Sequence, residues 1–217
     1  MIIYTCPKCG SQLKHYCVAT FLPIHVYRCS IREKSKNVIS KLNYNDDGMV
    51  STDSIIKAVS EETNTDISFS YASFENLKVP SAFDIGAMMC VQNEKEGENR
   101  RKAAIILNSD KSVKFRRFSL AHELGHLINN NYTISDDDKE YTLSAHIQYD
   151  IFSFTDEQCN KDPVIESEQR ANIFALHVLM PSEAFKARVL SSDSFSEVAD
   201  YFGVDEDAVR SRALLGL

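Results

Sequence analysis

The segment best suited to chemistry is His122-Glu123-Leu124-Gly125-His126, which lies within an apolar stretch. If this stretch is helical, residues four positions apart project about 40° apart around the axis and one turn apart along it. The imidazoles of His122 and His126 can then reach one metal ion, and the carboxylate of Glu123 can hold a water molecule beside it. The alternative is a solvated helix face that carries two histidines, but the apolar flanks argue against such a face.

A catalytic zinc takes three protein ligands and leaves one coordination position for water. One known extension of the motif places a third histidine six residues after the second, and that position here is Tyr132. The other common solution is a glutamate from a later helix, for which Glu168 is the best-placed candidate. Glu166 is its rival; it lies about 200° from Glu168 around a helix, so both cannot face the metal. The alternative for Glu168 is an ordinary first-turn glutamate, which the helix dipole favours.

Two further polar residues belong to the same expected helix. Asn172 lies four residues after Glu168 and therefore on the same face, where it can hydrogen-bond a metal-binding histidine. His177 lies nine residues after Glu168, about 180° around the helix. We therefore expect His177 to point away from the metal and to serve in packing or at the surface.

Residues 1–34 are expected to form a small unit with the character of a zinc ribbon. Cys6-Pro7-Lys8-Cys9 has the spacing of a zinc knuckle, but the second knuckle is broken because Arg32 stands three positions after Cys29. Another nearby residue could replace the missing ligand; without one, the segment is a degenerate hairpin that binds no metal. The candidate ligands of a structural zinc are Cys6, Cys9, Cys17, His25 and Cys29.

The rest of the chain is predicted to divide into three parts. Residues 35–51 are polar and read as a linker, residues 52–190 as the metallopeptidase domain, and residues 191–217 as a helical tail packed on that domain. The tail is predicted to run helix, glycine turn, helix, a pattern like a helix-turn-helix. Its second helix begins with Asp205-Glu206-Asp207, which suits packing or a partner better than a phosphate backbone.

The predicted order of elements is that of an α+β protein with a small sheet. We expect a helix capped by Thr52-Asp53, strands at 83–91 and 103–108, a motif helix at 115–129, a helix at 165–179 and another from Ser182. A strand, a turn and then a helix with this motif is the plan of zinc-dependent peptidases. The strand at 103–108 should line the cleft, and a free edge there could add an extended substrate by backbone hydrogen bonds.

Composition and charge narrow the function classes. A hydrophobic content of 43% supports a buried core, and no apolar run approaches the ~20 residues that a transmembrane helix needs. With no signal-peptide pattern at the start, we expect a cytoplasmic protein whose six cysteines are thiols or metal ligands. Residues 1–41 carry seven basic residues against Glu33 alone, whereas the whole chain carries −7, so nucleic acid is not expected as the main partner.

Two longer patterns surround these candidate residues. The first is Arg117-Phe118-Ser119-Leu120-Ala121-His122-Glu123-Leu124-Gly125-His126, and the second is Glu168-x-x-Ala171-Asn172-x-Phe174-Ala175, followed by Leu179-Met180-Pro181. Together they resemble the ImmA/IrrE family of metallopeptidases over about residues 52–215. One departure is Arg170, where members of that family commonly carry a second glutamate; we expect it to lie off the metal-facing side.

The resemblance implies a zincin-like fold of the gluzincin type, with the metal bound by His122, His126 and Glu168 and with Glu123 as general base. It implies a zinc endopeptidase, with manganese as the alternative metal. Its protein substrate would be a transcriptional repressor, itself a DNA-binding protein, or an antitoxin-type regulator of a phage or mobile element.

A transition-state oxyanion would need a hydrogen-bond donor besides the metal. The candidates in the long segment between the two motif helices are Tyr132, His146 and Tyr149. The competing function is a non-catalytic regulator on the same scaffold, whose basic N-terminal ribbon would contact a protein or nucleic acid. The intact Glu123 argues against it, because a metal scaffold without catalysis needs no base.

Overall fold

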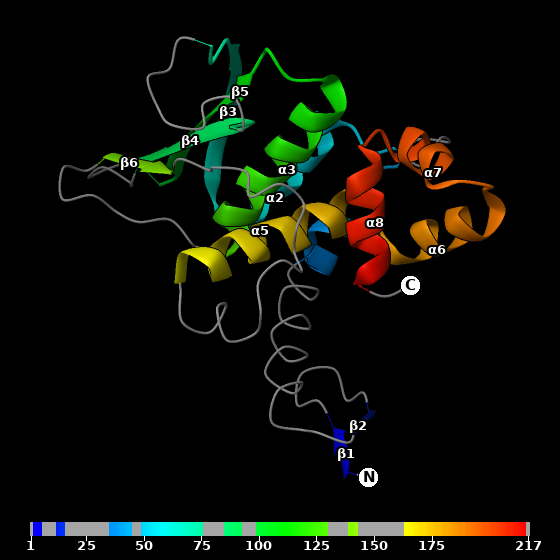
Figure 1. Cartoon of the computed structure of the whole chain (residues 1–217). Helices are drawn as coiled ribbons and strands as arrows, with labels where there is room; N and C mark the ends of the chain where they lie inside the picture. Colours follow the sequence, from blue (N-terminus) through cyan, green and yellow to red (C-terminus); the bar gives the residue numbers. More distant parts are fainter. Residues whose placement is uncertain are drawn as a thin grey trace.

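The computed structural model describes residues 2–5, 12–15, 35–44, 49–75, 85–92, 99–129, 139–142 and 163–215 (Figure 1). The strands are β1 (Ile2–Thr5), β2 (Gln12–His15), β3 (Thr65–Ala72), β4 (Ala87–Gln92), β5 (Arg101–Asn108) and β6 (Lys139–Thr142). The helices are α2 (Thr52–Thr63), α3 (Val113–Asn129), α5 (Pro163–Leu179), α6 (Ser182–Ser191), α7 (Phe195–Phe202) and α8 (Glu206–Leu214). The predicted α+β class is confirmed.

The main sheet has four strands in the order β3-β5-β4-β6. Strand β3 is parallel to β5, whereas β4 is antiparallel to both β5 and β6. Strand β5 is therefore paired on both sides, so the free edge that substrate addition at residues 103–108 would require is not present. The apolar run that identified β5 in the sequence is typical of a central strand. A central strand has neighbours on both sides and therefore no unpaired edge.

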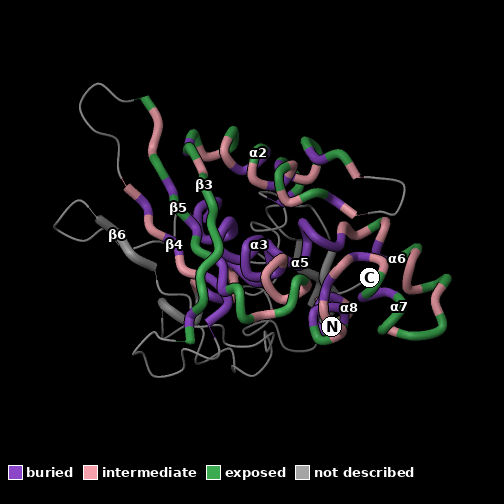
Figure 2. The backbone as a smooth tube through the Cα atoms, turned by 90° about the horizontal axis from the view of Figure 1, so that it is seen from above, coloured by how far each residue is buried: buried purple, intermediate pink, exposed green. Residues whose placement is uncertain are grey.

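One face of the sheet carries the core. Along β5, Ala103, Ile105 and Leu107 are buried, while the residues between them are exposed. The helices α2, α3 and α5 gather on one side of the sheet in both views (Figures 1 and 2). This alternation follows from the period of two in a strand, and it places the motif helix α3 against the buried face.

Strand β3 was not predicted, although its sequence carries the pattern of a strand. It lies at the end of the strand order, and all but Thr65 and Ile67 of its eight residues are exposed. Its Ile67, Phe69 and Tyr71 nevertheless alternate with polar residues, which is the period-two pattern of a strand, so the signal was present in the sequence and was missed.

Several predicted boundaries also shift. Helix α2 is capped by Ser51, whose Oγ accepts from the Ser54 amide at 3.1 Å, and the strand expected at 83–91 begins at Ala87. Strand β5 and helices α3 and α5 each begin two residues earlier than predicted.

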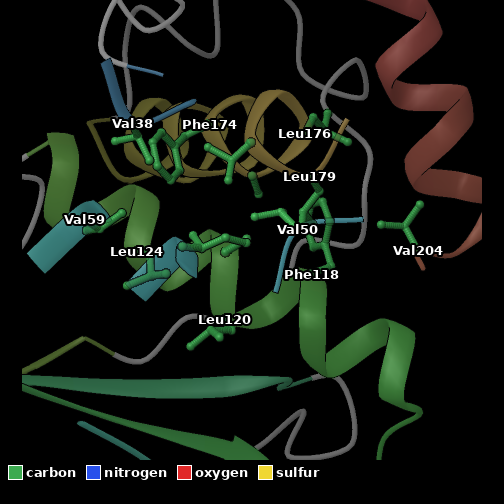
Figure 3. Packing of buried hydrophobic residues seen from close by; sticks show 14 of the residues in the cluster. Val38, Val50, Val59, Phe118, Leu120, Leu124, Phe174, Leu176, Leu179 and Val204 are labelled. Carbon is green, nitrogen blue, oxygen red and sulfur yellow. The ribbon is translucent and has the colours of Figure 1, made fainter. Parts of the chain in front are cut away.

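The described part of residues 35–51 is not a linker. Residues 35–39 are helical, and Val38, Leu42 and Val50 are buried in the same core as the side chains of α3 and α5 (Figure 3). The Arg117 guanidinium of α3 also donates to the Val50 carbonyl at 2.6 Å. Most of the apolar residues of this segment lie in the core or pack against it. Its polar average composition therefore predicted a linker wrongly.

The C-terminal tail belongs to the same core. Gly203 ends α7 with a φ of 64°, a left-handed conformation that glycine adopts without strain, and the chain turns there into α8. Val198, Phe202, Val204 and Val209 are all buried in the common core. The predicted sequence of helix, glycine turn and helix is therefore present, and its apolar faces are used for packing.

Arg212 fastens α8 to the turn between α5 and α6. Its side chain is fully buried; the Nε group donates to the Met180 carbonyl at 3.0 Å and an Nη group donates to Ser182 Oγ at 3.0 Å. The guanidinium also lies over the ring of Phe185, with its central carbon 4.9 Å from the ring centroid. A buried cation held in this way is costly to remove, because its partners are left without a donor.

The N-terminal strands β1 and β2 form an antiparallel hairpin in which Ile2 pairs with His15 and Thr5 with Gln12. The candidate zinc ligands Cys6, Cys9, Cys17, His25 and Cys29 all lie outside the described residues, so the structural zinc stays a prediction. Among the described helices, none is long and apolar enough to cross a membrane.

We expect Arg212→Ala to lower the free energy of unfolding by about 3 kcal/mol, since it removes two charge-assisted hydrogen bonds from a buried site. The matched control is Arg210→Ala in the same helix; Arg210 is exposed and pairs with Glu206 one turn away. This control should change stability by no more than about 0.5 kcal/mol. Urea unfolding measures both, and equal losses would contradict the anchoring role of Arg212.

Candidate metal centre

Helix α3 brings the two motif histidines together in its C-terminal half. The Nε2 atoms of His122 and His126 lie 3.0 Å apart, and both side chains are only 1% exposed. Residues 118–129 of this helix are all buried, so neither histidine belongs to a solvated face. The helical spacing predicted from the sequence therefore produces the expected convergence.

Helix α5 supplies the third group. Glu168 Oε2 lies 3.1 Å from His122 Nε2, and Glu168 Oε1 lies 3.4 Å from His126 Nε2. One possible ligand atom from each of the three residues lies within 4.8 Å of the other two. Two imidazole nitrogens and one carboxylate oxygen are a donor set that zinc accepts readily, so these residues fit a divalent metal ion.

The position of Glu168 depends on how closely α5 approaches α3. A Cβ atom added to Gly125 would lie 2.8 Å from Ala171 Cα and 2.9 Å from the Ala171 carbonyl oxygen. These are backbone atoms, which cannot move aside as the end of a flexible side chain can. Gly125 therefore allows a helix contact that any larger residue would push apart, and this contact carries Glu168 to the histidines.

Asn172 occupies the place predicted for it. Its Oδ1 atom lies 2.7 Å from His122 Nδ1, and the side chain is 6% exposed. When Nδ1 carries the imidazole proton it donates to this oxygen, and the Nε2 lone pair then faces His126 and Glu168. The spacing of four residues between Glu168 and Asn172 thus has a geometric basis in the site.

Ser167 contacts the other histidine, and sequence reasoning missed it. Its Oγ atom lies 3.3 Å from His126 Nδ1, and the side chain is partly buried. Ser167 is adjacent to Glu168 in the sequence and so about 100° away around the helix. The same-face spacing that identified Asn172 could not identify Ser167, because the contact depends on where α5 crosses α3.

The buried carboxylates give the site a strong preference for positive charge. Burial raises the pKa of Glu168, but hydrogen bonds with His122 and His126 outweigh burial and hold that pKa well below its ordinary value. Burial lowers the pKa of His122, yet the hydrogen bond and charge of Glu168, together with the charge of Glu123, leave it raised. A cation between the imidazoles is therefore favoured electrostatically.

The remaining predicted residues stand as follows. Glu123 is fully buried beside His122. His177 is 9% exposed and is not part of the three-residue cluster, and Arg170 is half-buried in α5. The side chain of Glu166 is not described. The three candidate oxyanion donors Tyr132, His146 and Tyr149 lie outside the described residues and stay predictions.

Comparison with known proteins adds one finding. The model of a peptidase family, described as an IrrE N-terminal-like domain, matches residues 89–214, more than half of the chain. The match begins in β4, contains the whole cluster of His122, His126 and Glu168, and ends in α8. No curated protein sequence matches the chain at a significant level.

We expect Gly125→Ala to reduce stability by about 1 to 3 kcal/mol, because its methyl group meets the backbone of Ala171. In an unobstructed helix the same substitution would stabilise by about 1 kcal/mol, so the sign of the effect is informative. The displaced α5 should also carry Glu168 away and weaken zinc binding. Urea unfolding and chelator competition test this, and a more stable variant with unchanged zinc affinity would contradict it.

Proposed function

The chain belongs to the peptidase family described as the IrrE N-terminal-like domain, and on this premise we propose that it is a zinc-dependent endopeptidase that cleaves a transcriptional repressor or an antitoxin-type regulator. Family membership supports a metallopeptidase-type function and hence a protein substrate. The observation that supports a metal-dependent mechanism is the convergence of His122, His126 and Glu168 on one point.

In this proposal His122, His126 and Glu168 hold the metal. A bound zinc would supply Lewis acidity, polarising a peptide carbonyl and acidifying water. Asn172 keeps the His122 ring in the orientation and tautomer that direct Nε2 at the ion. Zinc is the first choice for two imidazoles and one carboxylate, and manganese is the alternative.

Glu123 is the proposed general base. It follows His122 in the sequence and is fully buried, so its carboxylate is held in a medium of low dielectric constant. From there it accepts a proton from the attacking water and delivers that proton to the amine that leaves the cleaved peptide bond. A structural metal site needs no proton acceptor beside its histidines, so this position of Glu123 supports the catalytic assignment.

The finer identity of the substrate rests on the resemblance to the ImmA/IrrE family. A repressor or an antitoxin acts on the genome or on a cytoplasmic toxin, so the proposed site of action is the cytoplasm. A phage or another mobile element is the proposed genetic context. Inactivation of such a regulator needs only a few cuts, which suits an enzyme with narrow substrate range.

We expect Glu123→Gln to bind zinc as the wild type does but to lose cleavage by about 10²- to 10⁴-fold, since the amide cannot accept the proton from water. The assay co-expresses the chain with candidate repressors and antitoxins encoded near its gene and detects new N-termini by mass spectrometry.

His126→Ala is the control for this assay and should lose both zinc and cleavage. If Glu123→Gln cleaves at the wild-type rate, the assignment of Glu123 as the general base is wrong. Zinc binding that His126→Ala leaves unchanged would remove the proposed metal site altogether.

The second candidate function is a non-catalytic regulator. The observation that favours it is the basic charge of residues 1–41, which lie outside the family match. On this alternative the chain binds DNA in the low micromolar range, and the affinity falls steeply between about 50 and 200 mM salt. A fluorescence anisotropy titration with duplex DNA measures it, with the lysine and arginine residues of 1–41 replaced by glutamine as the control.

A further inference from the structure

We propose that Ser167 is a positioning residue, which directs Nε2 of His126 at the metal by accepting a hydrogen bond from Nδ1–H of the same ring. This inference rests on the proposed metal-binding function of His122, His126 and Glu168. It concerns a residue that neither the motif nor the spacing in the sequence indicated. Its basis is the contact between Ser167 Oγ and His126 Nδ1 at 3.3 Å.

A neutral imidazole has one N–H group and one lone pair, on opposite nitrogens of the ring. His126 can present the Nε2 lone pair to a metal only when Nδ1 carries the proton. Because His126 is 1% exposed, bulk water does not supply the acceptor that this proton needs. Ser167 Oγ lies where the acceptor is required, and a hydroxyl oxygen can accept while its own hydrogen points elsewhere.

Residues of the same helix, α5, thus contact the Nδ1 atoms of both histidines. Asn172 faces His122 Nδ1 at 2.7 Å, and Ser167 faces His126 Nδ1 at 3.3 Å. Glu168 lies between these two residues in the sequence and contacts both Nε2 atoms. Helix α5 therefore provides one direct ligand and both groups that orient the other two ligands.

The contact between Ser167 and His126 also shares its cause with the position of Glu168. Ala171, one turn after Ser167, meets the backbone of Gly125, the residue before His126. This close approach sets the distance between the Ser167 side of α5 and the His126 side of α3. The serine is placed by the same helix crossing that places the carboxylate.

The competing explanation is that Ser167 is an ordinary helical serine. Its hydroxyl would then satisfy the carbonyl one turn earlier in α5, a common use of serine within helices. In that case removal of the hydroxyl leaves the metal affinity unchanged. The two explanations differ in their effect on metal binding and not in their effect on folding.

The test compares Ser167→Ala with Ser167→Thr in the full chain, by zinc titration against a chromophoric chelator. Ser167→Ala should weaken zinc binding about 10- to 100-fold, the usual effect of losing a group that orients a metal ligand. Ser167→Thr keeps a hydroxyl and should stay within about threefold of the wild type. All proteins also carry Cys6→Ser and Cys9→Ser, so that the N-terminal thiols do not contribute.

The matched control is Ser60→Ala. Ser60 is a partly buried helical serine in α2, and its hydroxyl donates to the Thr65 carbonyl at 2.6 Å. This variant loses one helix hydroxyl, as Ser167→Ala does, but should bind zinc with wild-type affinity. With cobalt as the probe, the visible absorption bands should change in Ser167→Ala and not in Ser60→Ala.

Thermal melts in the presence of chelator separate positioning from stability. In chelator, Ser167→Ala should have the same melting temperature as the wild type. Added zinc should raise the melting temperature of Ser167→Ala less than that of the wild type. The inference fails if Ser167→Ala keeps wild-type zinc affinity and cobalt bands, if Ser167→Thr is as weak as Ser167→Ala, or if the variant melts much earlier in chelator. A wild-type chain whose zinc binding does not depend on His126 would instead overturn the proposed function.

Discussion

The metal centre depends on a helix crossing that leaves no room for a side chain. At Gly125, an added Cβ would lie under 3 Å from the backbone of Ala171, so α3 and α5 meet almost backbone to backbone. This contact adds a third possible metal ligand to the two histidines of α3, because it brings Glu168 within 3.4 Å of both rings. The hydrogen bonds to the outer ring nitrogens follow from the same crossing.

The site concentrates negative charge in a buried place. Glu123 is fully buried and Glu168 is 9% exposed, and both lie close to the histidines. Two carboxylates in a medium of low dielectric constant are unfavourable unless positive charge compensates them. Part of that compensation comes from His122, whose pKa the carboxylates raise despite burial. A divalent cation at the convergence point would supply the rest, which is how the chain's own residues favour metal binding.

The fold that supports this crossing extends beyond the matched family segment. The match begins at residue 89, but two elements that precede this residue are part of the fold. Strand β3 pairs with β5, and α2 buries Ile55 and Val59 in the common core. Residues 35–51 add Val38 and Val50 to the same core. At the other end, Arg212 ties α8 to the turn that follows α5. Packing on both sides therefore holds α5 in the position that the metal centre requires.

The sequence by itself determined what depends on local spacing: the motif helix with His122 and His126 on one face, the later helix with Glu168 and Asn172, and the central strand β5. The tertiary structure alone decided how the elements meet. It showed that β5 has no free edge, that the supposed linker enters the core, that β3 pairs in parallel with β5, and that Ser167 reaches His126. Helical and strand periods are properties of a few neighbouring residues, whereas a crossing between helices over 40 residues apart is fixed by packing of the whole core.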